Sequence, residues 1–350
     1  MTLGADIFRL RYLIGLAAMA GLILLLGACS RSSNPITLTG ETMGTYWTVR
    51  LAELPPSQSI AGLRGQINRL LDKINDEMST YRDDSVITRF NQADKDGLVE
   101  LPDGFSQVLS EALYWAEASD GAFDPTTGPL VNLWGFGPDG SIEQPPSQAD
   151  IDAVKQRVGW QKLDFDQDAQ TLRQSGQIYL DLSAIAKGWG VDKVAEHLAR
   201  AGVEGFLVDI GGELRASGTR GDGTAWRVGI ERPARDRREA VTIIEIMDLA
   251  IATSGNYRNF FEADGRQFSH LIDPRSGQPI THNTVSVTVV TETATAADAL
   301  ATALSVMDVE DAYAFARDRN LAVFWLLAGE EALSERMTPA FQRLLGEEHS

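Results

Sequence analysis

The chain has 350 residues, a single cysteine and a formal charge of −18, from 49 acidic and 31 basic side chains. Such an acidic surface argues against sequence-independent nucleic-acid binding, and one cysteine excludes an internal disulfide or a zinc cluster of several thiolates. An anionic ligand would therefore need a metal ion, or locally placed Lys and Arg, to supply positive charge.

The first 28 residues are typical of a lipoprotein signal peptide. Two arginines precede an apolar run from Leu13 to Leu26, and Leu26-Gly27-Ala28-Cys29 has the form of a lipobox. Lipidation of Cys29 would anchor the chain through a tether at residues 29–35. A retained transmembrane helix is the alternative, but the run is shorter than the roughly 20 residues needed. We expect a lipid-anchored protein on the periplasmic face of the inner membrane.

Residues 36–346 are predicted to form one large α+β domain, with mixed sheets and packed helices. Helices are expected at Ser57–Met78, Phe105–Ser119, Gln148–Val158 behind a Ser147 cap, Ala184–Ala201, Ala296–Met307 and Val309–Arg317. Strands are expected at Thr37–Leu51, Phe206–Ile210, Trp226–Ile230, Val241–Ile246, Val285–Val290 and Leu321–Leu327. The first strand is interrupted at Met43-Gly44, which we interpret as a bulge, with a pocket-lining role as the alternative.

Gly135-Phe136-Gly137-Pro138-Asp139-Gly140 matches the dinucleotide pattern G-x-G-x-x-G. A true fingerprint passes from a strand directly into a helix whose N-terminus holds the pyrophosphate. Here Pro138 intrudes, and the following Ser141–Pro146 segment cannot begin a helix. We therefore reject a Rossmann fold.

The segment from Asp181 to Gly190 is a stronger candidate for a phosphate site. It opens a helix, and it combines small residues with Lys187. A helix start offers unpaired N–H groups and a positive dipole end, both suited to phosphate. The alternative is that Asp181 or Ser183 only caps the helix.

Asp298 and Thr302 are candidate metal ligands. They lie four residues apart in an Ala-rich stretch that is predicted to be helical, so both oxygens project from one face. The surroundings are too apolar for a freely solvated carboxylate, and a buried carboxylate needs a partner. A carboxylate and a hydroxyl suit Mg²⁺, which leaves its other positions to water and substrate phosphate.

Among the four histidines, His270 is the plausible acid or base, because it lies beside Ser269 and an Asp273-Pro274 turn. A structural role is the alternative. No paired histidine spacing indicates zinc. By themselves, Tyr81 and Phe123 in the turn Ala122-Phe123-Asp124-Pro125-Thr126 are weak evidence of a ring-binding site.

Six blocks together resemble the ApbE family of FAD:protein FMN transferases, in the family's order and over almost the whole mature chain. They are Glu41-Thr42-Met43-Gly44-Thr45, Ala122-Phe123-Asp124-Pro125-Thr126, Asp181-Leu182-Ser183-Ala184-Ile185-Ala186-Lys187-Gly188, Thr253-Ser254-Gly255-Asn256-Tyr257-Arg258, Ser269-His270-Leu271-Ile272-Asp273-Pro274 and Ala297-Asp298-Ala299-Leu300-Ala301-Thr302. Each block alone is of modest specificity, and the joint match is highly specific.

The resemblance implies a T-fold-like α+β architecture, FAD as substrate, Mg²⁺ as cofactor, and transfer of FMN onto a threonine of a partner protein with release of AMP. The residues implied to contact FAD are Met43, Tyr81, Ala122, Phe123, Asp124, Asp181, Lys187 and Ile272. The implied metal ligands are the Ala184 carbonyl, Asp298 and Thr302. The family's usual acceptors are subunits of membrane redox complexes, such as the Na⁺-translocating NADH:quinone reductase and Rnf.

Two positions depart from some members of that family. Ala301 stands where some members have a second aspartate, and Lys187 where some have an acidic residue. For the chemistry, we expect Mg²⁺ to contribute most, Arg258 to steady phosphate charge, and His270 or Asp273 to accept the hydroxyl proton. An FAD pyrophosphatase and a non-catalytic FAD-binding lipoprotein are the alternatives.

Overall fold

A computed structural model describes residues 35–137, 140–232, 239–255, 260–263, 266–329 and 332–346. Its centre is an eight-stranded sheet in the order β1-β2-β6-β7-β10-β15-β16-β17, and each neighbouring pair is antiparallel. The strands are β1 (Ile36–Thr42), β2 (Thr45–Leu51), β6 (Phe206–Ile210), β7 (Glu213–Ser217), β10 (Ala250–Gly255), β15 (Thr284–Thr291), β16 (Ala322–Ala328) and β17 (Leu333–Met337). The α+β class is confirmed, and this sheet is antiparallel rather than mixed.

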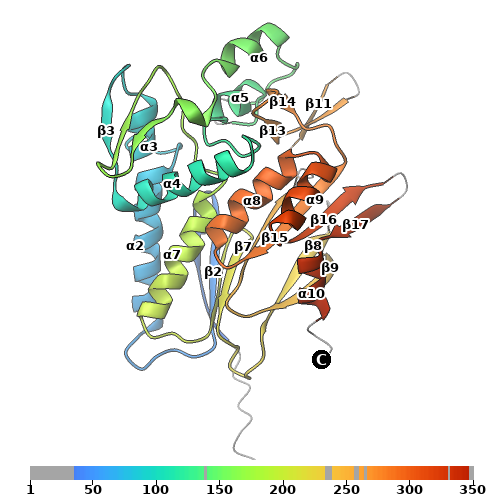
Figure 1. Cartoon of the computed structure of the whole chain (residues 1–350). Helices are drawn as coiled ribbons and strands as arrows, with labels where there is room; N and C mark the ends of the chain where they lie inside the picture. The colour runs from blue at the N-terminus through green and yellow to red at the C-terminus, as the bar shows by residue number, and fades with distance from the viewer. Residues whose placement is uncertain are drawn as a thin grey trace, which may run out of the picture.

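Helices cover one face of the sheet (Figure 1). They are α2 (Ile60–Met78), α4 (Asp103–Ala118), α7 (Ala186–Arg200), α8 (Ala294–Val306) and α9 (Val309–Asp318). In β6, Phe206, Val208 and Ile210 belong to the main core under these helices, whereas Leu207 belongs to the core on the opposite face. This alternation is the period of two that a strand buried on both faces requires.

The opposite face is covered by a hairpin and the last helix. The hairpin strands are β8 (Trp226–Arg232) and β9 (Glu239–Ile246), and the helix is α10 (Pro339–Gly346). Trp226, Ile244 and Phe341 from these elements share a core cluster with Phe324 and Leu326 of the central sheet. The middle strands of the sheet are therefore buried on both faces, whereas β1 and β2 leave one face exposed.

Shorter elements gather at one end of the helical layer (Figure 1). They are α3 (Val86–Asn91), α5 (Gly128–Leu133), α6 (Gln148–Lys155), the 3₁₀ turn Trp160–Lys162, β3 (Leu98–Glu100), β4 (Asp164–Asp166), β5 (Thr171–Arg173), β11 (Phe260–Ala263), β12 (Arg266–Ser269), β13 (Ile272–Asp273) and β14 (Gln278–Pro279). The β13–β14 hairpin packs against α5, since Trp134 just beyond α5 donates a hydrogen bond to the Gly277 carbonyl at 2.9 Å.

The predicted long helix is confirmed in type and in the face that it buries. Leu63, Ile67, Leu71 and Ile74 are buried along α2, at the spacing of one helical stripe. Ser59 caps this helix by accepting a hydrogen bond from the Gly62 amide at 3.1 Å. The Ser147 cap of α6 is confirmed in the same way, through the Asp150 amide at 3.2 Å.

Met43 and Gly44 form a hairpin turn, so the bulge interpretation is wrong. Both residues have positive φ, of 49° and 69°, and they join β1 to β2, which pair from Thr42 and Thr45 outward. Positive φ at both central residues is the mark of a two-residue hairpin turn. The turn places the Met43 side chain against α7, because a Cβ built on Gly190 would lie 3.3 Å from Met43 Cε.

The glycine pattern that begins at Gly135 follows helix α5 rather than a strand, and no helix begins at residues 140–146. The Rossmann interpretation is therefore excluded, as expected. The signal peptide, Cys29 and most of the tether lie outside the described residues, as do Asn256–Asn259. Within the part that the structure describes, no helix is both long and apolar enough to span a membrane.

Candidate active site

The chain enters α7 through a turn that does not cap the helix. Asp181 Oδ1 accepts hydrogen bonds from the backbone amide and the hydroxyl of Ser183, the amide at 2.8 Å. The N-cap residue is Ile185, which makes no side-chain cap. The capping alternative for Asp181 and Ser183 is therefore not what the structure shows, and the Ile185 and Ala186 amides instead donate to the Leu182 carbonyl, at 3.0 and 2.8 Å.

Asp298 of α8 bonds to the first turn of α7. Its Oδ2 accepts a hydrogen bond from the Gly188 amide at 3.0 Å, and its side chain is only 3% exposed. Gly188 is the third residue of α7, so its amide has no carbonyl partner within the helix, and Asp298 supplies the acceptor.

Gly188 is required where α7 crosses α8. A Cβ built on it would lie 2.2 Å from the Ala294 carbonyl oxygen and 2.9 Å from Asp298 Cβ. Contacts below 3.0 Å are not tolerated by real Cβ atoms, so only glycine fits without moving a helix. The close crossing brings the start of α7 within hydrogen-bonding distance of Asp298.

A buried ionic group lies at the same crossing. Lys187 Nζ is 2.7 Å from Glu213 Oε1 and 3.7 Å from Asp298 Oδ1. Glu213, the first residue of β7, is 4% exposed, and its second oxygen has no hydrogen-bond partner among the described residues. Three elements thus meet here with two carboxyl groups and one ammonium, so the group carries one excess negative charge whenever both carboxyls are ionised.

Burial would by itself lower the pKa of Lys187, but the Asp298 and Glu213 carboxylates outweigh it and raise that pKa. Lys187 is therefore a permanent cation in this group. For Glu213, burial is the largest effect and raises its pKa to about 7, against the opposing pull of Lys187. A buried excess of carboxylate is costly unless another cation joins it.

Thr302 lies one helical turn beyond Asp298. Its hydroxyl is 3.4 Å from the Ser254 hydroxyl at the end of β10. The neighbouring Thr253 bonds across to Thr288 at 2.8 Å. Ala301, between the two predicted ligands, is fully buried in the core between α8 and the sheet. The predicted pair of Asp298 and Thr302 is therefore brought together on one face of α8.

The Asp124 turn forms a neighbouring wall. Asp124 Oδ1 accepts from the Thr126 amide at 2.8 Å and from its hydroxyl at 2.7 Å, and Oδ2 accepts from the Trp160 amide at 3.1 Å. The Pro125 carbonyl accepts from the Asp181 amide at 2.7 Å. The Asp124 and Asp181 loops are therefore adjacent, and burial raises the pKa of Asp124.

Several of the other predicted FAD contacts are buried. Phe123 is 2% exposed in the main core, Ala122 is 1% exposed against α8, and Ile272 is 4% exposed beside α5. Their side chains are enclosed by the core. Tyr81 is the opposite case at 75% exposed, and its ring is open to a partner.

The two candidate proton acceptors, His270 and Asp273, differ in their contacts. His270 is half-buried, with its ring centre 6.2 Å from that of Phe136 in an edge-on arrangement. Asp273 is engaged by Arg275, whose backbone amide and Nε donate to its Oδ1, each at 2.9 Å. Arg258 lies outside the described residues.

Sequence reasoning missed Glu213, together with Asp192 of α7 and Arg215 of β7, which pair at 2.6 Å. Asp192 and Glu213 are 4% exposed. A usable signal was present, because Glu213 follows an apolar strand and Gly211-Gly212, and Asp192 lies in the apolar run Trp189–Val194. Charged residues in such places are rarely buried without a partner.

The chain is similar to known proteins over the stretch that contains these site residues. The ApbE family model matches residues 43–325. The chain belongs to the ApbE family. The FAD:protein FMN transferase of Vibrio cholerae is 41% identical over 331 residues, covering 94% of this chain and 98% of the relative. The enzyme of that name from Escherichia coli K12 is 37% identical over 321 residues, covering 91% of each chain.

Solved ApbE structures share the fold. The flavin transferase ApbE from Vibrio cholerae superposes with a TM-score of 0.81 at 39% identity, over 89% of this chain and 99% of that one. The apo form of Pseudomonas stutzeri flavinyl transferase ApbE gives 0.82 at 37% identity, over 91% and 99%. The family and the α+β fold expected from the six blocks are confirmed.

Proposed function

We propose that this chain is an Mg²⁺-dependent FAD:protein FMN transferase that modifies a threonine of a partner protein. Full-length relatives at 37–41% identity carry the name FAD:protein FMN transferase, which supports flavin transfer from FAD to protein. The observation that carries the metal site is the α7–α8–β7 crossing, where Asp298 and Glu213 are buried with only one lysine between them.

The residues at this crossing fit a hard divalent cation. The groups that would hold the ion are all oxygens, namely the Asp298 carboxylate, the Thr302 hydroxyl and the Ala184 carbonyl just before α7. When bound there, Mg²⁺ would neutralise charge on the FAD pyrophosphate.

Around that ion, the chain supplies binding and orientation. The start of α7 presents the positive end of the helix dipole to phosphate. Lys187 adds a fixed positive charge next to Asp298. We assign FAD contacts to Met43 from the hairpin turn, to Asp124 and Asp181 from their paired loops, and to Tyr81 through its exposed ring, with backbone contacts from Ala122, Phe123 and Ile272.

In the transfer itself, the threonine oxygen forms a bond to the phosphorus on the riboflavin side of the pyrophosphate. The bond from that phosphorus to the bridging oxygen breaks, and AMP leaves. The hydroxyl proton goes to a base, which we assign to His270, because Asp273 is held by Arg275 and so is a weaker acceptor. Arg258 remains proposed as a phosphate contact.

We also propose that Cys29 carries a lipid that holds the domain at residues 36–346 on the periplasmic face of the inner membrane. The support is the lipobox in the sequence. A membrane-held transferase would be placed to reach subunits of membrane redox complexes of the Na⁺-translocating NADH:quinone reductase or Rnf type, which we propose as acceptors.

The test is incubation of the purified protein with FAD, Mg²⁺ and a peptide that carries the family's acceptor threonine. Mass spectrometry should find one added FMN on the peptide, and none on a matched peptide with alanine in place of that threonine. AMP and free FMN with an unmodified peptide would instead identify an FAD pyrophosphatase. FAD that is bound but never consumed would identify a non-catalytic flavin-binding protein.

A further inference from the structure

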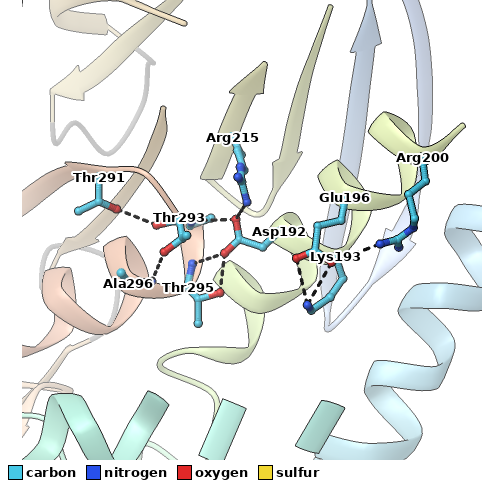
Figure 2. Close-up of polar contacts among 10 residues, drawn as sticks. Asp192, Lys193, Glu196, Arg200, Arg215, Thr291, Thr293, Thr295 and Ala296 are labelled. Carbon is cyan, nitrogen blue, oxygen red and sulfur yellow. Dashed lines mark hydrogen bonds and ion pairs between the residues drawn. The ribbon is translucent and has the colours of Figure 1, made fainter. Parts of the chain in front are cut away.

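A second buried ionic group lies next to the proposed metal site. Asp192 of α7 accepts four hydrogen bonds, from Arg215 Nη1 at 2.6 Å, from the Ala294 amide at 3.0 Å, and from the Thr295 amide and hydroxyl at 2.8 and 2.5 Å. Figure 2 shows the carboxylate between Arg215 of β7 and the first turn of α8. One side chain thus joins three elements.

Only a carboxylate suits this position. All four partners of Asp192 are donors, and an ionised carboxylate is the side chain that accepts on both oxygens without donating. Its charge is balanced by Arg215 and by the positive end of the α8 dipole. An asparagine in its place would direct an NH₂ group at donors and leave some of them unsatisfied.

The residues bonded around Asp192 lie on the same three elements, and on the same faces of them, as the residues at the proposed metal site. On α7, Asp192 follows Gly188 by four residues, so both lie on the same helical face. On α8, Thr295 precedes Asp298 by three residues, again on one face. On β7, Arg215 follows Glu213 by two residues and shares its side of the strand.

Two neighbouring sets of polar contacts therefore connect the same three elements. We call them the Asp192 rung, made with Arg215, Ala294 and Thr295, and the Lys187 rung, made with Glu213 and Asp298. The Asp192 rung is fully paired, whereas the Lys187 rung has an excess negative charge and a Glu213 oxygen that no described residue bonds. The first rung fixes where α8 begins, and α8 carries Asp298 and Thr302. A rotation or slide of α8 would move both oxygens relative to the Ala184 carbonyl, which lies just before α7.

We propose that Asp192 is a positioning residue that holds α8 in the register that the metal ligands need. This inference rests on the metal site proposed above. It predicts that the rung controls the affinity for the ion, beyond any effect on stability. Removing groups that orient metal ligands commonly weakens metal binding by roughly 10- to 100-fold.

The test measures binding of Mn²⁺, as a paramagnetic substitute for Mg²⁺, by electron paramagnetic resonance of the free ion in the presence of FAD. Asp192→Asn should raise the Kd about tenfold or more. Thr295→Val removes only the hydroxyl donor and should raise it by a smaller factor, while Thr295→Ser keeps that donor and should bind as the wild type does. The Thr295 pair remains informative if Asp192→Asn does not fold.

The matched control is Thr293→Ala. Thr293 is the N-cap of α8 itself and accepts from the Ala296 amide at 3.3 Å, a bond that lies within α8 and involves neither α7 nor β7. This variant loosens the same helix end and should lower the melting temperature, yet leave the Kd within about twofold. Figure 2 shows Thr293 and Asp192 at the same start of α8.

Three results would overturn the proposal. An unchanged Kd in Asp192→Asn would show that the rung is structural only. A Kd that rises in step with lost stability in every variant, Thr293→Ala included, would show a general loosening of the fold. A wild type that transfers flavin but binds no Mn²⁺ would remove the metal site, and with it this inference, while leaving the transferase activity established.

Discussion

The crossing of α7 over α8 gives a sharp prediction through two glycines on one helix. Gly188→Ala would place a methyl group 2.2 Å from the Ala294 carbonyl oxygen, a backbone atom that cannot rotate away. Gly190→Ala would place it 3.3 Å from Met43 Cε and from Ile210 Cδ1, which are the ends of flexible side chains. The first change forces two helices apart, and the second asks only for small side-chain shifts.

The expected magnitudes differ accordingly. Overpacking of a close-packed core costs about 1–3 kcal/mol, and a clash with backbone lies at the upper end of that range. Alanine gains about 1 kcal/mol over glycine in a helix interior, which offsets part of the cost. We expect Gly188→Ala to lose about 2 kcal/mol of unfolding free energy, and Gly190→Ala to stay within about 1 kcal/mol of the wild type.

Urea unfolding of the two variants gives the comparison, with the Mn²⁺ Kd measured on the same samples. Because Gly188→Ala separates α7 from Asp298, it should weaken metal binding as well as stability. Gly190→Ala should bind the ion normally. Equal stability and equal Kd in the two variants would refute the close crossing as the basis of the site.

Further predictions concern single side chains at the site. In EDTA, Lys187→Met should lose about 3 kcal/mol of unfolding free energy, because the buried Glu213 and Asp298 side chains lose the ammonium that neutralises them, and added Mg²⁺ should recover part of that loss in urea unfolding. Thr302→Val should weaken Mg²⁺ binding by calorimetry, while Thr302→Ser should retain it; equal affinities would exclude the hydroxyl as a ligand. Asp124→Asn should cost about 1–3 kcal/mol, because its partners are all donors, and should raise the KM for FAD in steady-state kinetics. An unchanged KM would remove Asp124 from the binding site.

The fold is predictable where burial follows a local period. The apolar stripe of α2 and the alternation of β6 determine the type of each element and the face it buries. The turn at Met43 is not predictable in this way, because a bulge and a two-residue hairpin both interrupt an extended run, and positive φ at a methionine leaves no mark in the sequence. Pairing of β1 with β2 decides between them.

The site is predictable only as separate fragments. Asp298 and Thr302 share a helix, so their spacing in the sequence is enough to place them on one face. Glu213 and Asp192 were missed, because their partners lie 23 to more than 100 residues away or on other elements. Charged residues that come together where two helices cross have no fixed separation in the sequence, so no spacing pattern reveals them.

The central claim is most directly tested by measuring AMP and FMN-modified peptide in one reaction. Wild-type protein with FAD, Mg²⁺ and acceptor peptide should yield both products in equal amounts, and neither EDTA-treated protein nor Asp298→Asn should yield them at a comparable rate. AMP without modified peptide, or equal modification by Asp298→Asn in EDTA, would contradict flavin transfer at this metal site.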